Sequence, residues 1–343
     1  MGMVRYALLI APSSNRVYAD ASIRLTISEL AVFASTVLDA KLTDVEELSL
    51  AGVPYVGFAA PDPGLSERDI AYLSNLSSVY ALFAIEGELL RPTALRPLAF
   101  FDDDLLTIQK YSGKTNEQFT KLLLNVTLLA STHAPHMLDR RLVVLDPLCG
   151  RGTTLNQALM YGYDALGIDT DGKDFDIYSA FIRTWLKRKR LKHKAEITPV
   201  RKEKRLIARR LSVSIGMSTS TNTSLTMFHG DSIKAREFLK GGVADVIVAD
   251  LPYGVMHGSR SGDANISRSP LQLLRDAVPV WTQLIQPGGA VGISWNTHVA
   301  SRADAVEILE ENSLLVRTGD GYDDFEHWVD QSINRDILVA RKV

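Results

Sequence analysis

Five short apolar runs, each followed by a stretch with helical spacing, succeed one another in the second half of the chain. They occupy residues 142–145, 165–168, 225–228, 245–248 and 290–294. Their alternation with helices predicts a doubly wound, mainly parallel sheet, hence an α/β fold. In such sheets ligands bind beyond the carboxyl ends of the strands. The residues that follow each run are therefore the first candidates for a functional site.

The first part of the chain has a different order: strand, helix, strand, strand, helix, strand. The expected strands are 5–11, 45–50, 53–59 and 79–85, and the first expected helix is 21–38. Ala51-Gly52 predicts a hairpin turn between the two middle strands. Ser66, with Asp69 three residues later, is typical of a helix start. This order matches a small α+β ferredoxin-like domain.

Length and composition fit two globular domains. The chain has 343 residues, of which 46% are hydrophobic and 23% charged, and a domain has roughly 150 residues. We expect an N-terminal domain over 1–95, a linker and helical lead-in over 96–137, and the α/β domain over 138–343. The single cysteine excludes a disulfide framework and fits a reducing compartment. No apolar stretch approaches the roughly 18 residues of a spanning helix, so we expect a cytoplasmic protein without a membrane partner.

Positive charge is concentrated in one segment. Of the 38 Lys and Arg residues, 13 lie between Arg183 and Arg210, together with only two acids. Such a strip on an otherwise acidic chain indicates a footprint for a polyanion such as nucleic acid, although cations also stabilise the ends of helices. We assign residues 183–222 to a basic insertion in the α/β domain. The stretch 212–224 is rich in Ser and Thr, and we expect an exposed loop there.

A turn with two glycines follows the first run, Asp146-Pro147-Leu148-Cys149-Gly150-Arg151-Gly152-Thr153. Gly150 and Gly152 have no Cβ, so the backbone can turn tightly and approach a ligand closely. The Asp146 charge favours an amino group over a pyrophosphate. A dinucleotide motif does not match, because position 155 is Leu155 rather than a small residue. The remaining alternative is a plain strand–helix turn.

An acidic residue follows each of the next two apolar runs. Asp169 comes after 165–168, where a carboxylate can accept hydrogen bonds from both hydroxyls of a ribose. Asp231 follows 225–228 and could accept from an adenine amino group. It could also cap the helix that comes next, and both roles can hold together.

The most specific pattern is Asp250-Leu251-Pro252-Tyr253, which follows the fourth run. Pro252 keeps Leu251 extended, which can aim the Leu251 carbonyl in the same direction as the Asp250 side chain. Two converging acceptors suit an amino group with two N–H donors, and Tyr253 offers a flat face for a planar base. Acceptors on both N–H bonds make a conjugated amine more nucleophilic. We predict that these four residues form a catalytic set that needs no metal.

The two motifs resemble those of the class I S-adenosylmethionine-dependent methyltransferases. The run from Asp146 to Thr153 is similar to their glycine-rich motif, and Asp250 to Tyr253 is similar to the Asp/Asn-Pro-Pro-Tyr motif of the branch that methylates amino groups. Within that branch, 114–253 most resembles the RNA enzymes related to the tRNA guanosine-10 N2-methyltransferases. The resemblance implies a Rossmann-like sheet of seven strands, the last of which, near 336–340, is antiparallel.

The resemblance also implies a cofactor, a reaction and a partner. The cofactor is S-adenosyl-L-methionine, with Asp146, Pro147, Cys149, Gly150 and Gly152 at its methionine end, Asp169 at the ribose and Asp231 at the adenine. The implied reaction is methyl transfer to an exocyclic amino group, guanine N2 of tRNA. The alternatives are a DNA adenine-N6 or cytosine-N4 methyltransferase, a protein glutamine methyltransferase, and a nonenzymatic nucleic-acid-binding protein with the same fold.

Two departures from the family bear on these expectations. Leu251 replaces the first proline of the motif, which its backbone role tolerates. The RNA-binding THUMP domain normally follows the ferredoxin-like module, but roughly 25 residues between Arg91 and Asn116 cannot hold a domain, which needs about 50 or more. The basic segment 183–210 is therefore the candidate RNA surface.

Overall fold

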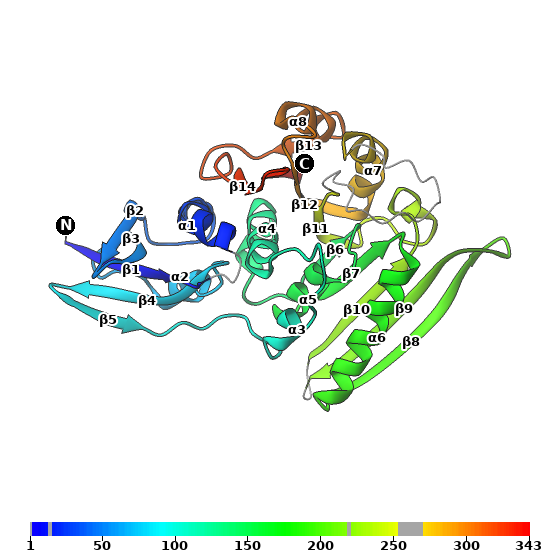
Figure 1. Cartoon of the computed structure of the whole chain (residues 1–343), viewed down its shortest axis with the longest axis horizontal. Coiled ribbons are helices and arrows are strands. Elements are labelled where there is room, and N and C mark those ends of the chain that lie inside the picture. Colours follow the sequence, from blue (N-terminus) through cyan, green and yellow to red (C-terminus); the bar gives the residue numbers. More distant parts are fainter. Residues whose placement is uncertain (1, 13–15, 218–220, 253–269) are drawn as a thin grey trace.

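The computed structural model describes residues 2–12, 16–217, 221–252 and 270–343, which form two sheets and the helices around them (Figure 1). The strands of the first sheet are β1 (Met3–Ile10), β2 (Thr43–Leu50), β3 (Val53–Pro61), β4 (Val79–Glu86) and β5 (Leu89–Thr93). Their order is β2-β3-β1-β4-β5, and all neighbours are antiparallel. Helix α1 (Arg16–Thr36) follows β1, and α2 (Glu67–Leu73) follows β3.

Local sequence signals account for most of this sheet. Ser66 caps α2 in a capping box with Asp69, and Ala51-Gly52 separates β2 from β3, as the sequence predicts. Strand β5 was not expected, because Pro92 has no backbone N–H for a ladder. Its position at the edge of the sheet tolerates that loss.

The second sheet has ten strands in the order β13-β15-β12-β11-β6-β7-β10-β9-β8, with β14 paired to β15. Its parallel centre consists of β6 (Val143–Asp146), β7 (Asp164–Asp169), β10 (Thr221–His229), β11 (Ala244–Asp250) and β12 (Ile285–Asn296). The flanking strands are β8 (Lys192–Lys202), β9 (Arg205–Met217), β13 (Leu314–Val316), β14 (His327–Asp330) and β15 (Ile333–Lys342). The mixed α/β fold is thus confirmed, and β15 is antiparallel. The expected number of seven strands is exceeded, because the β8–β9 hairpin and β14 extend the sheet.

The prediction of an exposed loop over 212–224 was wrong. Residues up to 217 belong to β9 and those from 221 onward to β10, and the two strands pair antiparallel. Val213 and Ile215 are buried while Ser214 between them is exposed. This is the two-residue period of a strand with one covered face. The high Ser and Thr content obscured that period in the sequence.

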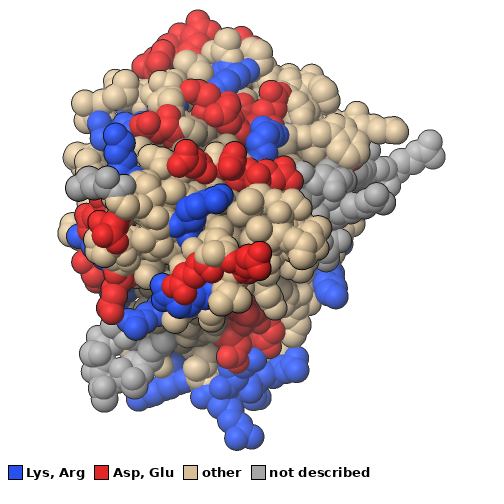
Figure 2. Space-filling view, turned by 90° about the vertical axis from the view of Figure 1, so that its left-hand side faces the viewer, with Lys and Arg blue, Asp and Glu red and all other residues tan. Residues whose placement is uncertain are grey.

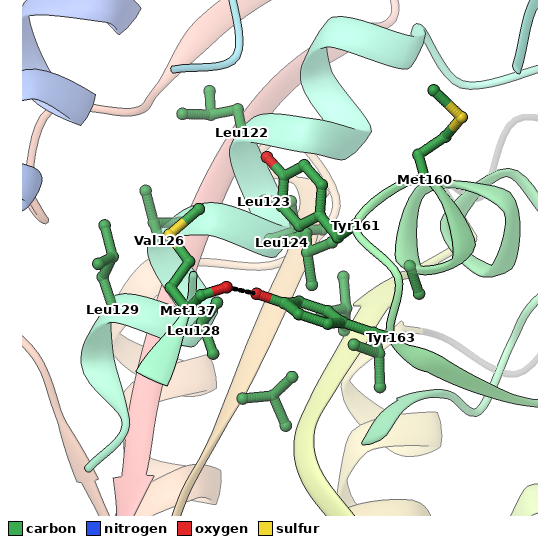
Figure 3. Packing of buried hydrophobic residues seen from close by; sticks show 14 of the residues in the cluster. Leu122, Leu123, Leu124, Val126, Leu128, Leu129, Met137, Met160, Tyr161 and Tyr163 are labelled. Carbon is green, nitrogen blue, oxygen red and sulfur yellow. Dashed lines mark hydrogen bonds between the residues drawn. The ribbon is translucent and has the colours of Figure 1, made fainter. Parts of the chain in front are cut away.

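Helices cover both faces of the second sheet. Helices α4 (Glu117–Ala130), α5 (Thr153–Met160) and α6 (Gly172–Arg188) pack on one face, and η2 (Ser232–Glu237), α7 (Pro270–Leu284) and α8 (Arg302–Glu311) belong to the core of the other. Two shorter helices are α3 (Asp104–Thr107) and η1 (Ala134–His136). Figure 3 shows the leucines of α4 against Tyr161 and Tyr163, whose hydroxyl donates to the Met137 carbonyl at 2.6 Å. None of the helices in these described ranges has the length and apolarity that crossing a membrane requires.

One buried polar network joins α1 to α4. The Glu29 carboxylate on α1 is fully buried and accepts from Asn125 Nδ2 on α4 at 2.7 Å and from the Ser77 hydroxyl at 2.6 Å. The Tyr161 hydroxyl donates to Asn125 Oδ1 at 2.7 Å. Burial raises the pKa of Glu29. Because buried polar groups need partners, this network fixes α4 against the N-terminal helices.

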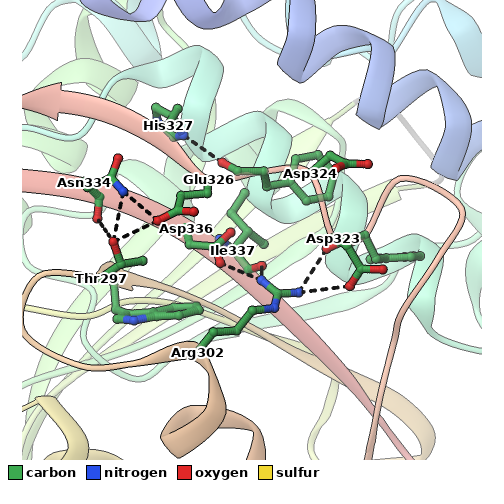
Figure 4. A network of polar contacts seen from close by, with 12 residues as sticks. Thr297, Arg302, Asp323, Asp324, Glu326, His327, Asn334, Asp336 and Ile337 are labelled. Carbon is green, nitrogen blue, oxygen red and sulfur yellow. Dashed lines mark hydrogen bonds and ion pairs between the residues drawn. The ribbon is translucent and has the colours of Figure 1, made fainter.

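A second network fixes the carboxyl end of β12 (Figure 4). Asn334 Nδ2 donates to Thr297 Oγ1 at 3.0 Å and to Glu326 at 2.6 Å, and Arg302 donates to Asp336 at 2.6 Å. These contacts hold β14 and β15 beside β12. β12 is the strand that carries Ser294, three residues before Thr297.

Candidate active site

A cavity of about 330 Å³ opens at the carboxyl ends of β6 and β11. Four parts of the chain that are far apart in sequence line it: residues 111–123, the glycine turn 146–154, Asp174 of α6, and the end of β11. The lining residues that determine its shape and charge are Tyr111, Thr115, Asp146, Cys149, Gly150, Arg151, Asp174, Asp250, Leu251 and Pro252. The cavity lies where ligands of parallel α/β sheets bind.

The two glycines of the turn have different tasks. Gly150 has φ +47°, and a Cβ built there would meet no heavy atom within 4 Å. Gly152 has φ +79°, and its Cβ would approach the Tyr178 ring to 2.3 Å. Both conformations favour glycine. The absence of a side chain at Gly150 therefore leaves open space at the cavity. The absence of a side chain at Gly152 lets the turn pack against α6.

Asp169 connects the end of β7 to the glycine turn. Its carboxylate accepts from the Gly150 amide at 2.7 Å and from the Asp171 amide at 2.8 Å, and burial raises its pKa. Its carbonyl accepts from the Gly230 amide at 2.9 Å. Gly230 lines a second cavity of about 330 Å³, together with Thr170, His229, Asp231 and residues 206–209 of β9. Neighbours of Asp169 thus line both cavities.

The first cavity carries excess negative charge. Asp146 is 3% exposed, and burial, with smaller contributions from the charges of Asp169 and Asp250, raises its pKa to about 7. Among the described lining residues Arg151 is the only Lys or Arg. Its guanidinium is paired with Asp174 at 2.8 Å and lies over the Tyr111 ring, 4.5 Å from the centroid. With that cation neutralised, the cavity favours a positively charged ligand.

Asp250 is held by hydroxyl groups from two other elements. Thr115 Oγ1 donates to its Oδ2 at 2.6 Å, and Ser294 Oγ donates to its Oδ1. Ser294 stands opposite Asp250 in the parallel pair β11–β12, and its carbonyl accepts from the Leu251 amide at 2.9 Å. The carboxylate is therefore fixed at the wall of the cavity.

Most of the residues singled out in the sequence lie at the two cavities. The first is lined by Asp146, Cys149, Gly150, Asp250, Leu251 and Pro252, and the second by Asp231, which also caps η2. Pro147, Gly152 and Asp169 do not line either cavity: Pro147 is buried, Gly152 packs on Tyr178, and the Asp169 carboxylate accepts from the Gly150 amide. Tyr253 lies outside the described residues.

The sequence motifs do not include Tyr111, Thr115 and Ser294, which the structure brings to the site. Residues 96–137 were expected to be a linker and lead-in, yet they supply Tyr111 and Thr115 to the cavity wall. The available signals were weak. Thr115 directly precedes the helix cap Asn116, and Ser294 ends the fifth apolar run. Neither position indicates a contact with Asp250 until the sheet order is known.

Comparisons with known proteins gave distant likenesses to solved structures. No family model matches the chain, and no curated protein matches it. Among solved structures, the N-methyltransferase NodS from Bradyrhizobium japonicum WM9 is 12% identical, with a TM-score of 0.40 over 66% of this chain and 94% of that one. Magnesium protoporphyrin IX methyltransferase from Synechocystis PCC 6803 is 15% identical, with a TM-score of 0.40 over 68% and 87%. The precorrin-6y C5,15-methyltransferase from Geobacter metallireducens is 12% identical, with a TM-score of 0.38 over 72% and 99%.

All three neighbours are methyltransferases by name. Likenesses at this level carry no weight for the activity of this chain, which has to be inferred from its own residues.

Proposed function

We propose that the protein is an S-adenosyl-L-methionine-dependent methyltransferase that acts on an exocyclic amino group of a nucleobase, guanine N2 in tRNA. The observation that carries this proposal is the shared cavity: a glycine turn that holds the buried Asp146 and whose one cation, Arg151, is already paired with Asp174, and the anchored Asp250 carboxylate line the same space. The first suits a cationic cofactor, and the second suits an amine.

The residues present fit the cofactor. Asp146 would pair with its ammonium group, and Asp169 would accept from the ribose hydroxyls. The second cavity would take the adenine, between Asp231 and the buried Ala208 of β9. Open space at Gly150 supports a close approach of the ligand to the backbone. When bound, the cofactor supplies an electrophilic methyl carbon on a sulfonium.

On the substrate side, the chain positions the amine. Asp250 and the Leu251 carbonyl would accept from its two N–H donors, and Tyr253 would stack on the base, as the sequence motif predicts. With the amine held there, its nitrogen lone pair would face the methyl carbon that the cofactor would supply, and the proton that the nitrogen loses on methylation would pass to water. Holding the reacting groups in line accounts for much of the rate.

The basic insertion supports a nucleic-acid substrate. Five basic residues of this segment are exposed: Lys187 and Arg188 at the end of α6, Arg190 just after it, and Lys192 and Lys194 on β8. Figure 2 shows Lys and Arg gathered at the lower end of the molecule, the level at which α6 ends and β8 begins in Figure 1. Lys189 differs, because it is paired with Asp102 at 2.7 Å. We propose that this surface, which we call the basic insertion surface, contacts RNA phosphates.

We further propose that residues 1–95 form a ferredoxin-like domain and 138–343 the methyltransferase domain. The strand order β2-β3-β1-β4, with α1 after β1 and α2 after β3, supports the first assignment. The parallel centre with an antiparallel β15 supports the second. Residues 96–137 then connect the domains and also supply part of the cavity wall.

One set of measurements tests the function. Calorimetry should show binding of S-adenosylhomocysteine, and the protein should transfer a labelled methyl group to bulk tRNA that lacks the modification. Mass spectrometry of the digested nucleosides should identify N2-methylguanosine. Transfer to duplex DNA or to glutamine of a protein instead would select one of the alternatives. Binding of RNA without cofactor binding would indicate a nonenzymatic protein.

A further inference from the structure

The Asp250 carboxylate is anchored from two sides. Ser294 comes from the neighbouring strand β12, whereas Thr115 comes from the segment before α4, and each hydroxyl donates to a different carboxylate oxygen. A carboxylate oxygen can accept more than one hydrogen bond. Two anchors on opposite oxygens restrict rotation of the carboxylate plane. The direction in which the carboxylate accepts hydrogen bonds is then fixed.

The position of Thr115 is itself determined by contacts on both sides. Asn116 caps α4 by accepting from the Gln118 amide at 2.8 Å and from the Phe119 amide at 3.1 Å. Lys114 Nζ donates to the Leu106 carbonyl at 2.6 Å and pairs with Glu117. Thr115 therefore reaches Asp250 from a backbone that is fixed immediately before and after it.

The same segment is attached to the glycine turn. The Tyr111 ring lies under the Arg151 guanidinium, and Gln109 Nε2 donates to the Arg151 carbonyl at 3.4 Å. Residues 109–115 thus contact the turn at one end and Asp250 at the other. The segment 109–115 therefore both lines the proposed cofactor cavity and orients Asp250, the proposed acceptor for the amine.

We propose that Thr115 and Ser294 are positioning residues that hold Asp250 as an acceptor for the N–H donors of the target amine. The inference rests on the proposed function and extends it to the class of substrate. An ionised carboxylate that is oriented in this way accepts hydrogen bonds and donates none, so the site selects an N–H group over a carbonyl oxygen. Thr115, which belongs to the segment that lines the cavity, contributes to this orientation of the Asp250 carboxylate.

Matched substitutions of Thr115 test this role. Thr115→Val keeps the shape but removes the donor, and we expect kcat for methyl transfer to tRNA to fall about 10- to 100-fold, less than for the loss of a whole preorganised group. The Kd for S-adenosylhomocysteine should stay within about twofold of wild type, since Thr115 contacts Asp250 and not the turn. Thr115→Ser should restore most of the rate. The control is Thr107→Val, whose hydroxyl bonds within α3 and which should leave kcat unchanged.

Two further readouts separate positioning from a general structural role. In an Asp250→Asn background, Thr115→Val should cause little additional loss of rate, because both changes act through the same group. In a crystal structure of the Thr115→Val and Ser294→Ala double variant, the Asp250 carboxylate should turn away from its wild-type orientation. This second measurement needs no substrate.

The outcomes distinguish the two proposals. A wild type that neither binds S-adenosylhomocysteine nor methylates tRNA contradicts the proposed function, and the crystal structure then decides the positioning role alone. Wild-type activity with an equally active Thr115→Val overturns the positioning role and leaves the function standing. An unmoved Asp250 carboxylate in the double variant overturns it as well.

Discussion

The Asp169 carboxylate accepts a hydrogen bond from the Gly150 amide at 2.7 Å, so the end of β7 and the turn after β6 meet in a single contact. The sequence places these residues 19 positions apart, in two motifs. The parallel pairing of β6 and β7 brings them to one edge of the sheet. Gly150 and Gly230, which both donate hydrogen bonds to Asp169, each line one of the two cavities.

Asp169→Ala should weaken binding of S-adenosylhomocysteine by about 1.5–3 kcal/mol, because charged hydrogen bonds to the ribose are removed. Calorimetry measures this directly. The control is Asp171→Ala, which removes the cap of α6 and should lower stability by about 0.5–2 kcal/mol without changing affinity. If Asp169→Ala binds S-adenosylhomocysteine as tightly as the wild type, Asp169 does not bind the ribose.

Cofactor binding should depend on pH through Asp146. Its pKa in the free protein is raised to about 7 by burial, and an ammonium ligand favours the ionised form and lowers that pKa. Below pH 7 binding must displace a proton, so affinity for S-adenosylhomocysteine should rise from about pH 5.5 to about 7 and then level off. Asp146→Asn should bind more weakly at about pH 7.5 and show a flat profile. An identical profile in both proteins would assign the dependence to another group.

Substitutions of Gly150 and Gly152 should change different properties of the protein. Gly152→Ala places a Cβ 2.3 Å from the Tyr178 ring at φ +79°, and should lower the free energy of unfolding by about 1–3 kcal/mol. Gly150→Ala points its methyl group into open space, so we expect a smaller loss of stability and a larger loss of cofactor affinity. Denaturant unfolding and calorimetry on both variants separate the effects. Equal losses of both quantities would contradict this division of tasks.

The five parallel strands of the second sheet could be predicted from the sequence, whereas the β8–β9 hairpin at its edge could not. The five apolar runs and their strand-end acids Asp146, Asp169, Asp231 and Asp250 carry strong local signals, and the structure places all four acids at strand ends or shortly after them. The β8–β9 hairpin lacks such a signal. The exposed face of its alternating pattern is rich in Lys, Arg and Ser, a composition that is also typical of a loop.

The contacts of Asp250 show a second limit. Thr115 lies 135 positions before Asp250, and Ser294 lies 44 after it. No periodicity or motif connects residues at such separations. Only the strand order, which places β12 beside β11, and the burial of α4 bring the three side chains together.

The basic insertion surface should carry the salt dependence of RNA binding. Changing Lys187, Arg188 and Arg190 to Gln should weaken tRNA binding and reduce the slope of log K against log salt by about 0.7–0.9 for each phosphate that is no longer neutralised. Lys189→Gln is the matched control, because Lys189 already pairs with Asp102 and Asp104. Should the triple variant keep the wild-type slope, the N-terminal domain becomes the leading RNA surface.

The central claim is that Asp250 acts on the target amine and not on the cofactor. The most direct test measures two quantities on Asp250→Ala: the rate of methyl transfer to tRNA and the Kd for S-adenosylhomocysteine. Removal of a preorganised acceptor should slow transfer about 10²- to 10³-fold, while the Kd stays within a few-fold, because Asp250 lies on a different strand from the glycine turn. Full activity would contradict amine methylation by this site, and an equal loss of cofactor affinity would place Asp250 in the cofactor pocket.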